Sequence, residues 1–448
     1  MDAKGALKVL IWSYLFFLIF EGALRKWILP GLSSVLLVVR DPIVLAIYVL
    51  AFASGLFPLT PPVILILALG MITAAMSVLG IATVPVILYG FRCNFLHLPL
   101  IFLFPKVLDL ADVKRMGQVL LVVGIPMALL MALQFKAGRE SWLNIGAGGV
   151  GGQLDSAMGK VRASGTFSFI SGPIYFYSLI AAFLCLSQVS KVAPVWVIFP
   201  SAAALIVAAA ASGSRSLLGG IAIVIVSFFT GMLLYPKAIV KGVKLMIIGM
   251  LAFAVASSLG IYKEASDTTK ERIEMASSYE GGFEGLLERY LGTFLNPLKN
   301  LGTAPLFGYG LGTGTNAGAA LLGAQGAFIL GEDEWGRIIM EAGPLFGLAY
   351  IFLRVGLFLY FLFIGLVATR SGNLYPLVLF GAGGLNIMSG QFGQPTTLGF
   401  AVFTGGLVLA ARNIPLNDQK PPTLPQSSVS HEPIPNLKKV GAFTVRPD

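Results

Sequence analysis

A cluster of charged residues is the first feature of the sequence that could do chemistry. The stretch GEDEWGRIIMEAGPLFG, residues 331–347, concentrates charge in a chain that is only 12% charged, with Glu332, Asp333, Glu334, Arg337 and Glu341 close together. A carboxylate beside an attacking hydroxyl can act as a general base, which typically contributes about 10²–10⁴-fold to a rate. The same pattern is typical of a salt-bridged helix entrance, with Asp333 as the N-cap and Glu334, Arg337 and Glu341 near one helical face. Both interpretations stay open.

Three arginines could bind an anion. Arg215 stands in the small-residue stretch ASGSRSLLGG, Arg162 stands in KVRASGTF, and Arg289 follows LLE. Guanidinium groups match phosphate oxygens with two parallel hydrogen bonds, and small residues let a ligand approach the backbone. The other interpretation of Arg215 is an ordinary interfacial arginine that reaches towards water. We expect the three arginines to form a cationic pocket.

Other residue types narrow the chemistry. The two histidines, His97 and His431, are too few for a zinc site or for Ser-His or Cys-His catalysis. Cys93 and Cys185 both stand in apolar surroundings, where small core residues are the expected role. The glycine-rich stretch GYGLGTG, residues 308–314, lacks the Lys-Ser/Thr of a phosphate-binding loop, so we expect a tight loop that packs on the rest of the protein.

The elements that must position these residues are membrane helices. The chain is 56% hydrophobic and its mean hydropathy is +0.85. An apolar run of about 20 residues can cross the hydrocarbon layer as a helix. We therefore expect an all-α polytopic membrane protein with about twelve spans, at residues 9–28, 42–57, 62–82, 84–104, 117–135, 170–188, 193–211, 217–235, 245–262, 337–366, 374–391 and 396–411.

The loops suggest an orientation and a division of the chain. Short loops at 106–115, 191 and 237–244 carry Lys and Arg and share a side with both termini, which the positive-inside rule makes cytoplasmic. Residues 1–412 then form the membrane domain, with outer loops at 136–169 and 263–335. The larger loop is expected to carry amphipathic helices, because Phe283, Leu287 and Phe294 follow a helical stripe. The proline-rich tail, residues 413–448, should be disordered.

Three residues have expected structural roles. Asp41 precedes Pro42 and is expected to be the N-cap of a helix. Arg92 and Arg354 fall inside or at the edge of apolar segments, where helix-end arginines normally extend their charge to the interface. The net charge of +10 does not require nucleic acid, because anionic lipids attract basic loops equally well.

The order of motifs resembles the superfamily of O-antigen ligases and O-antigen polymerases. VRASGTFSF, ASGSRS, LERY followed by APLFGYGLG, and an acidic motif before EAGPLFG stand in the order of that family, over about residues 160–350. The resemblance implies a GT-C-like, metal-independent membrane glycosyltransferase of the bacterial inner membrane that acts on the periplasmic face without a cofactor. Its implied partners are a polyprenyl-pyrophosphate-linked oligosaccharide, membrane lipids and chain-length regulator or export proteins, and no nucleic acid.

The resemblance also implies roles for individual residues. Arg215 matches the arginine of the family's Ser-Arg motif, and Arg289 matches its loop arginine. The ligases carry a His-Asn pair nine residues before the glutamate of their E-x-G motif. The corresponding position here, counted back from Glu341, is Glu332, followed by Asp333. The missing histidine favours a polymerase of O-antigen or exopolysaccharide repeat units, with catalytic Glu332, Arg215 and Arg289. Arg162, Asp333, Glu334, Arg337 and Glu341 are then expected to bind substrate.

Three other classes stay open on the sequence. A ligase would transfer the glycan to lipid A-core or another acceptor. A transporter of lipid-linked glycans would place ionisable residues at mid-membrane on broken helices. A scaffold subunit of an export complex would need no arginine pocket.

Overall fold

The computed structural model describes residues 2–149, 152, 154–156, 159–236, 239–258, 260–280, 292, 294–323 and 333–412. All of them belong to one compact unit, Met1–Asn413. The described residues are predominantly helical, and their only β pairings are two isolated bridges in the loop after residue 136. The expected all-α architecture is confirmed for this part of the chain.

The helices follow one another with short connections over most of the chain. Those before the first long loop are α1 (Ala3–Ala23), α2 (Ser33–Leu36), α3 (Arg40–Ala53), α4 (Pro61–Met76), α5 (Val84–Phe91), α6 (Leu100–Val107) and α7 (Leu110–Lys136). Those after it are α8 (Ser171–Val189), α9 (Val195–Ser212), α10 (Arg215–Leu234), α11 (Ile239–Ser258), α12 (Gly260–Glu280), α14 (Asn316–Leu321), α15 (Glu334–Arg370), α16 (Tyr375–Ser389) and α17 (Pro395–Ala410).

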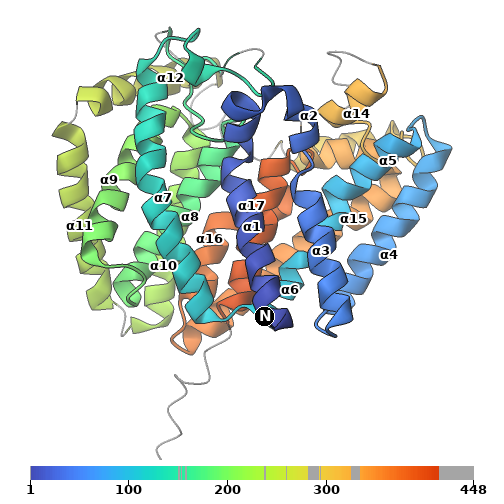
Figure 1. The fold of residues 1–448 in the computed structure, drawn as a ribbon, viewed down its shortest axis with the longest axis horizontal. Coiled ribbons are helices and arrows are strands. Elements are labelled where there is room, and N and C mark those ends of the chain that lie inside the picture. The colour runs from blue at the N-terminus through green and yellow to red at the C-terminus, as the bar shows by residue number, and fades with distance from the viewer. Residues whose placement is uncertain are drawn as a thin grey trace, which may run out of the picture. The chain divides into compact units, whose positions relative to one another are not determined.

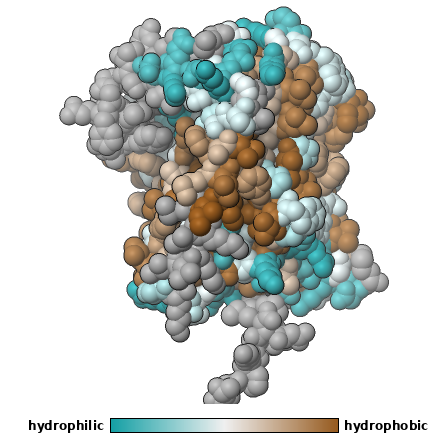
Figure 2. All heavy atoms as spheres, turned by 90° about the vertical axis from the view of Figure 1, so that its left-hand side faces the viewer, coloured by the Kyte–Doolittle hydropathy of each residue, from teal (hydrophilic) through white to brown (hydrophobic). Residues whose placement is uncertain are grey.

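Many of these helices are suited to a membrane. Eight described helices are long and apolar enough to cross one, and the number rises to ten if two bent helix pairs each count as one span. The two remaining apolar helices, α16 and α17, have 15 and 16 residues. Figure 2 shows the consequence on one face, where a hydrophobic zone lies between two hydrophilic ends. The chain is therefore a multi-pass membrane protein.

The two ends of the helix bundle carry different elements. The N-terminus lies at one end, where Lys8 of α1 pairs with Asp112 of α7 at 2.6 Å. The helices α2, α12 and α14 lie at the opposite end (Figure 1). Both long loops of the sequence therefore contribute to the same end of the bundle. Helices α8, α16 and α17 supply much of the core, since most of their side chains are buried.

Two of the expected spans are broken. The segment expected as one helix at 84–104 is α5, continued by a π-helical turn at Arg92–Leu96, and α6, with a bend of 42° at the break between Leu96 and Leu100. Pro99 forces the break, because its ring has no N–H and cannot continue the preceding helix. The segment expected at 337–366 begins at Glu334 and is broken at Gly343, which has φ 77°.

Other expectations need correction at the level of the loops. The region expected as an outer loop with amphipathic helices, 263–335, contains most of α12 and all of α14, and its outer position stays a prediction. Asp41 is not an N-cap, because α3 begins one residue earlier at Arg40 and Val39 occupies the cap position. The helical stripe expected around residues 283–291 and the tail at 413–448 lie outside the described residues.

Candidate functional site

The break in α15 is the feature from which the site is built. Pro344 has no N–H, so the carbonyl of Met340 loses its partner within the helix. The glycine-rich loop supplies replacements: Tyr309 N–H donates to Met340 O at 2.8 Å, and Gly310 N–H donates to Glu341 O at 2.9 Å. A Cβ on Gly308 would lie 2.3 Å from Glu341 O. Only glycine allows this approach, and the expected tight packing of the loop is confirmed.

Glu341 binds the same loop through its side chain. Its carboxylate accepts hydrogen bonds from Gly312 N–H at 3.0 Å and Gly314 N–H at 2.9 Å. Gly312 in turn packs on Gly90 of α5, where a Cβ on Gly90 would lie 2.3 Å from Gly312 N. Glu341 is fully buried. It therefore joins α15, the glycine-rich loop and α5.

A buried ion-pair network surrounds the start of α15. Arg337 donates to both oxygens of Glu334, at 3.0 and 2.8 Å, and to Asn94 Oδ1 at 2.9 Å. Its Nη1 lies 2.9 Å from Glu341 Oε1, an ion pair without an aligned hydrogen bond. Arg354 donates to Glu334 Oε1 at 2.7 Å. Two carboxylates thus balance two guanidinium groups.

The Glu334–Arg354 contact shows how sharply α15 turns. The two residues are 20 positions apart, and a straight helix would separate them by about 30 Å. Their contact requires residues 334–342 to fold back along the helix that follows Gly343. Gly347 permits this, because a Cβ there would lie 2.8 Å from the Cα of Ile339. The opening motif is therefore a short arm that turns back against the long helix.

The structure tests two expectations about the residues of this network, the cap at Asp333 and the position of Arg354. Asp333 accepts a hydrogen bond from Gly336 N–H at 2.6 Å, so its role as N-cap of α15 is confirmed. Burial raises the pKa of Asp333 above its ordinary value, and the hydrogen bond from Gly336 partly opposes this. Arg354 was expected to extend to the interface, but it is 1% exposed. Its guanidinium group also donates to the carbonyls of Ile387, Asn386 and Gly390.

A second buried network lies between α1, α3 and the π-helical turn at Arg92–Leu96. Arg92 donates to Asp41 Oδ2 at 2.7 Å, and His97 Nε2 is 2.9 Å from Asp41 Oδ1. His97 Nδ1 in turn lies 3.2 Å from the hydroxyl of Tyr14. The expected interfacial position of Arg92 is therefore wrong, because the side chain is buried against Asp41. Cys93 and Cys185 are free and buried, as expected.

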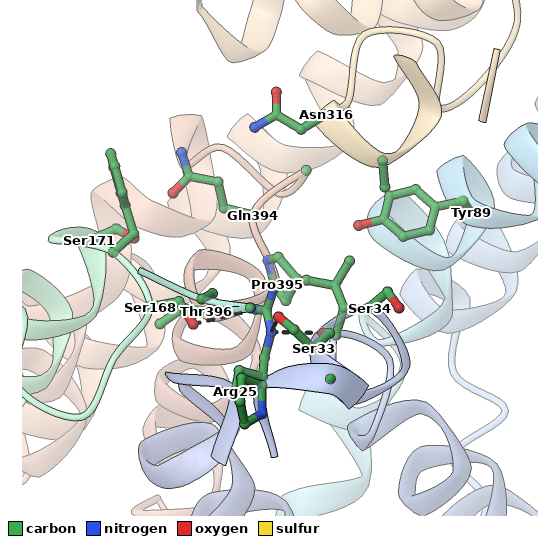
Figure 3. A pocket seen from close by; sticks show the side chains of 18 residues that line it. Arg25, Ser33, Ser34, Tyr89, Ser168, Ser171, Asn316, Gln394, Pro395 and Thr396 are labelled. Atoms are coloured by element: carbon green, nitrogen blue, oxygen red, sulfur yellow. Dashed lines mark hydrogen bonds between the residues drawn. The ribbon is translucent and has the colours of Figure 1, made fainter. Parts of the chain in front are cut away.

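The same region continues towards a cavity through Glu21. The carboxylate of Glu21 lies 3.3 Å from Arg40 Nε and 3.4 Å from Arg25 Nη1. Arg25 Nε also donates to the carbonyl and hydroxyl of Ser33, at 2.9 and 3.1 Å. Arg25 lies in the π-helical turn at Leu24–Ile28 that ends the first helix. The turn directs the guanidinium group into the cavity that Figure 3 shows.

The cavity has a volume of about 670 Å³, and half of its lining residues are polar and almost all of them neutral. Arg25 and Asn316 lie on opposite sides of it (Figure 3). Its polar lining side chains are Arg25, Ser33, Ser34, Tyr89, Ser168, Ser171, Asn316, Gln394 and Thr396. Among the described residues that line it, Arg25 alone is charged. Its hydroxyl and amide groups can both donate and accept hydrogen bonds.

A second cavity of about 390 Å³ adjoins the first between α8, α10 and α16. The two share Phe169, Ser171 and Gln394 as lining residues. Small and apolar residues form much of the second cavity: Ile170, Ile174, Gly219, Gly220, Ile223, Gly381, Ala382 and Leu385. A Cβ on Gly219 would meet no atom within 4 Å, and Leu385 is 45% exposed. The second cavity is therefore an open groove on an apolar helical surface.

Two of the expected anion-binding arginines lie near this groove. Ser216, the residue after Arg215, lines it. Burial lowers the pKa of Arg162 below its ordinary value, and the positive charge of Arg215 adds to this effect. Gly213 with φ 54° turns the chain between α9 and α10, and Ser214 caps α10. The structure thus brings together two of the three arginines of the expected pocket.

The remaining expected site residues divide into two groups. Glu332 and Arg289 lie outside the described residues. Glu334, Arg337 and Glu341 are buried in the network and do not line the polar cavity. Their role in binding substrate stays a prediction.

The sequence analysis did not identify Arg25 or the polar residues opposite it. One signal in the sequence points to Arg25, namely the charged stretch EGALRKW within an apolar run. The sequence does not show which residues lie opposite it. No group of three or more potential metal ligands occurs among the described residues.

Fold and site together define a multi-pass helical membrane protein with a polar cavity beside an apolar groove. We compared the chain with models of known protein families and with curated proteins, and neither comparison found a match.

Proposed function

We propose that this protein is a membrane glycosyltransferase that polymerises glycan repeat units carried on a polyprenyl pyrophosphate. One observation carries the proposal: a polar cavity and an apolar groove share Phe169, Ser171 and Gln394. A lipid-linked oligosaccharide has the matching chemistry, with hydroxyl groups at one end and a hydrocarbon chain at the other. Binding sites of this volume range suit sugars, which need several convergent polar groups. The ordered motifs shared with O-antigen polymerases and ligases support the same class.

The proposed reaction assigns the arginines to the leaving group. The bond between the anomeric carbon and the pyrophosphate oxygen breaks, and an acceptor hydroxyl forms the new glycosidic bond. Negative charge then develops on the pyrophosphate, which Arg215, Arg162 and Arg289 stabilise. The electrostatic interaction between Arg162 and Arg215 supports this role, because a pyrophosphate is attracted to both cations.

The proton of the attacking hydroxyl passes to a carboxylate, for which Glu332 is the candidate. Glu332 directly precedes Asp333, the N-cap of α15. Because Glu334, Arg337 and Glu341 already bind one another and the glycine-rich loop, we assign them to positioning this end of α15. The proposal includes the GT-C-like arrangement of about twelve spans, with both termini cytoplasmic, this end facing the periplasm of a bacterial inner membrane, and no cofactor or metal.

Polymer formation in cells tests the proposal. Arg215→Lys keeps the charge but loses the planar fork of donors. We expect it to reduce polymerisation by about 10²–10³-fold, the loss that follows removal of one oxyanion-stabilising donor. The matched control is Arg139→Lys, since Arg139 forms an exposed ion pair with Asp155. Polymer of wild-type amount and length in the Arg215→Lys variant, at normal membrane abundance, would contradict the proposal.

The second candidate is a transporter of lipid-linked glycans. Broken helices and buried charges favour it, since α15 is broken at Gly343 and Arg92 and Arg354 are buried. Reconstitution of the purified protein with a lipid-linked repeat unit separates the two. Longer glycans in the product support the transferase, whereas movement of unchanged substrate across the bilayer supports the transporter. Transfer to a lipid acceptor without elongation would indicate a ligase.

A further inference from the structure

The charge around Arg25 is not balanced by carboxylates of the described residues. Glu21 is the carboxylate in contact with Arg25, and Arg40 shares it. Asp41 does not help, because it pairs with Arg92 and His97. Lys26 adds a further buried cation, whose acceptors are a serine hydroxyl and two carbonyls. Among the described residues, this region therefore holds at least one positive charge without a carboxylate partner.

The surplus charge is directed into the polar cavity. Arg25 donates through Nε and Nη1, and no described residue accepts a hydrogen bond from its Nη2. The two Nη1 contacts, to Glu21 and Ser168, are both long at 3.4 Å. Ser33 and Ser168 bring hydroxyl groups to the same guanidinium group (Figure 3). A guanidinium group with free donors beside hydroxyl groups matches the oxygens of a bound anion.

The rest of the cavity matches a sugar. Ser34, Ser171, Asn316 and Gln394 supply neutral groups that can donate and accept hydrogen bonds. Tyr89 and Phe169 add aromatic surface, and Phe169 is 43% exposed. One surplus charge suits a carboxylate better than a pyrophosphate, for which the pair of Arg162 and Arg215 is the better match. We infer that Arg25 binds the carboxylate of an acidic sugar in the glycan, and so selects uronic-acid-containing repeat units.

This inference rests on the proposed function for the identity of the glycan, but its test is a direct binding measurement. The probes are methyl β-glucuronide and methyl β-glucoside, which differ only at C6, where the first has a carboxylate and the second a hydroxymethyl group. Affinities are measured by saturation-transfer NMR titration on the purified full-length chain in lipid nanodiscs. We expect the glucuronide to bind about 10–100-fold more tightly than the glucoside, because a hydrogen bond to a charged group has that effect.

Variants identify the residue responsible. Arg25→Gln should remove the preference for the glucuronide over the glucoside, whereas Arg139→Gln, at an exposed ion pair, should behave as wild type. Arg25→Lys, which keeps the charge needed beside Glu21, should show a reduced preference and covers the case in which Arg25→Gln does not fold. Equal affinities in the wild type, or a full preference in either Arg25 variant, would overturn the inference.

A third probe separates the two possible sources of the anion. Geranyl pyrophosphate imitates the lipid carrier, and we expect its affinity to fall in Arg215→Lys but not in Arg25→Gln. A loss in Arg25→Gln without any glucuronide preference would assign Arg25 to the carrier and overturn the acidic-sugar inference. Failure of the proposed function has a different signature, namely normal polymer in Arg215→Lys, which these binding titrations do not measure.

Discussion

At the scale of single residues, the buried charges have structural partners that explain their cost. An ion moved out of water loses several kcal/mol of hydration, and a partner must restore it. Glu334 does so for both Arg337 and Arg354, at 2.8 and 2.7 Å. Glu341 uses its carboxylate on two backbone N–H groups and on Arg337. Glu334, Arg337 and Glu341 therefore have partners within the fold, and the candidate base Glu332 directly precedes their N-cap residue in the sequence.

The network predicts a large effect of removing one carboxylate. Glu334→Gln leaves Arg354 and Arg337 without their shared partner, so we expect the stability of the fold to fall by about 3–5 kcal/mol. Asp155→Asn is the control, because its ion pair with Arg139 is exposed and should contribute at most about 1 kcal/mol. Thermal unfolding in one detergent measures both. A melting temperature for Glu334→Gln equal to that of the control would refute the structural role of the network.

The raised pKa of Asp333 predicts that the stability of the fold depends on pH. Its pKa is raised in the folded protein above the ordinary value of 3.8, so protonation stabilises the fold. Wild type should therefore gain stability relative to Asp333→Asn as the pH falls from neutral towards that value. The asparagine keeps the cap, so Asp333→Ala should be about 1 kcal/mol less stable than Asp333→Asn at every pH. Unfolding measured across this pH range checks both, and a difference between wild type and Asp333→Asn that does not change with pH would refute the first.

At the scale of elements, the break in α15 organises the site. Gly343 and Pro344 free two carbonyls, and the glycine-rich loop binds both. The arm formed by residues 334–342 folds back, which brings Glu334 to Arg354. Arg354 then connects the arm to α16, and Asn94 connects it to the π-helical turn after α5. A straight helix at this position would separate these groups and release the loop.

Gly343 tests the role of this break. Its φ of 77° and ψ of 171° are adopted almost only by glycine, and a Cβ would lie 2.2 Å from Leu306 O. We expect Gly343→Ala to destabilise the protein by more than the roughly 1–3 kcal/mol of backbone strain alone. Gly356→Ala, in the same helix with open space around its Cα, should be neutral or stabilising by up to about 1 kcal/mol. Similar melting temperatures for the two variants would show that the break is not needed.

At the scale of the whole molecule, the groups that form the site gather at one end of the bundle. Arg25, Arg162, Arg215, the glycine-rich loop and the start of α15 come from segments far apart in the sequence. The opposite end has the N-terminus and the Lys8–Asp112 pair. The distribution of short basic loops predicts that this opposite end is cytoplasmic.

Reporter fusions test this orientation. Alkaline phosphatase, which is active only in the periplasm, should be active when fused after Lys299 and inactive when fused after Lys439. The reason is that positive charges in short loops resist translocation. A cytoplasmic reporter such as green fluorescent protein should give the reverse pattern at the same two positions. Phosphatase activity only in the fusion after Lys439 would show that the orientation is the opposite one, and that the site does not face the periplasm.

The sequence by itself determined the class of fold. Runs of apolar residues predicted helical segments at every position where the structure has a long apolar helix, because a backbone in hydrocarbon must satisfy its own hydrogen bonds. Local signals were equally informative: Asp333 caps α15, and the glycines of GYGLGTG allow close packing. The cap depends only on neighbours in the chain, and glycine permits close packing whatever segment it meets.

Only the tertiary structure decided which charges meet. Arg354 and Arg92 were expected at the interface because a sequence does not show that Glu334 and Asp41 will be their partners. Arg25 was overlooked for the same reason, since Asn316 and Gln394 on the walls of its cavity come from distant segments. Long-range pairing depends on how helices break and fold back. The Gly-Pro pair at 343–344 indicates a helix break from the sequence alone. The contacts that the break creates depend on packing in three dimensions.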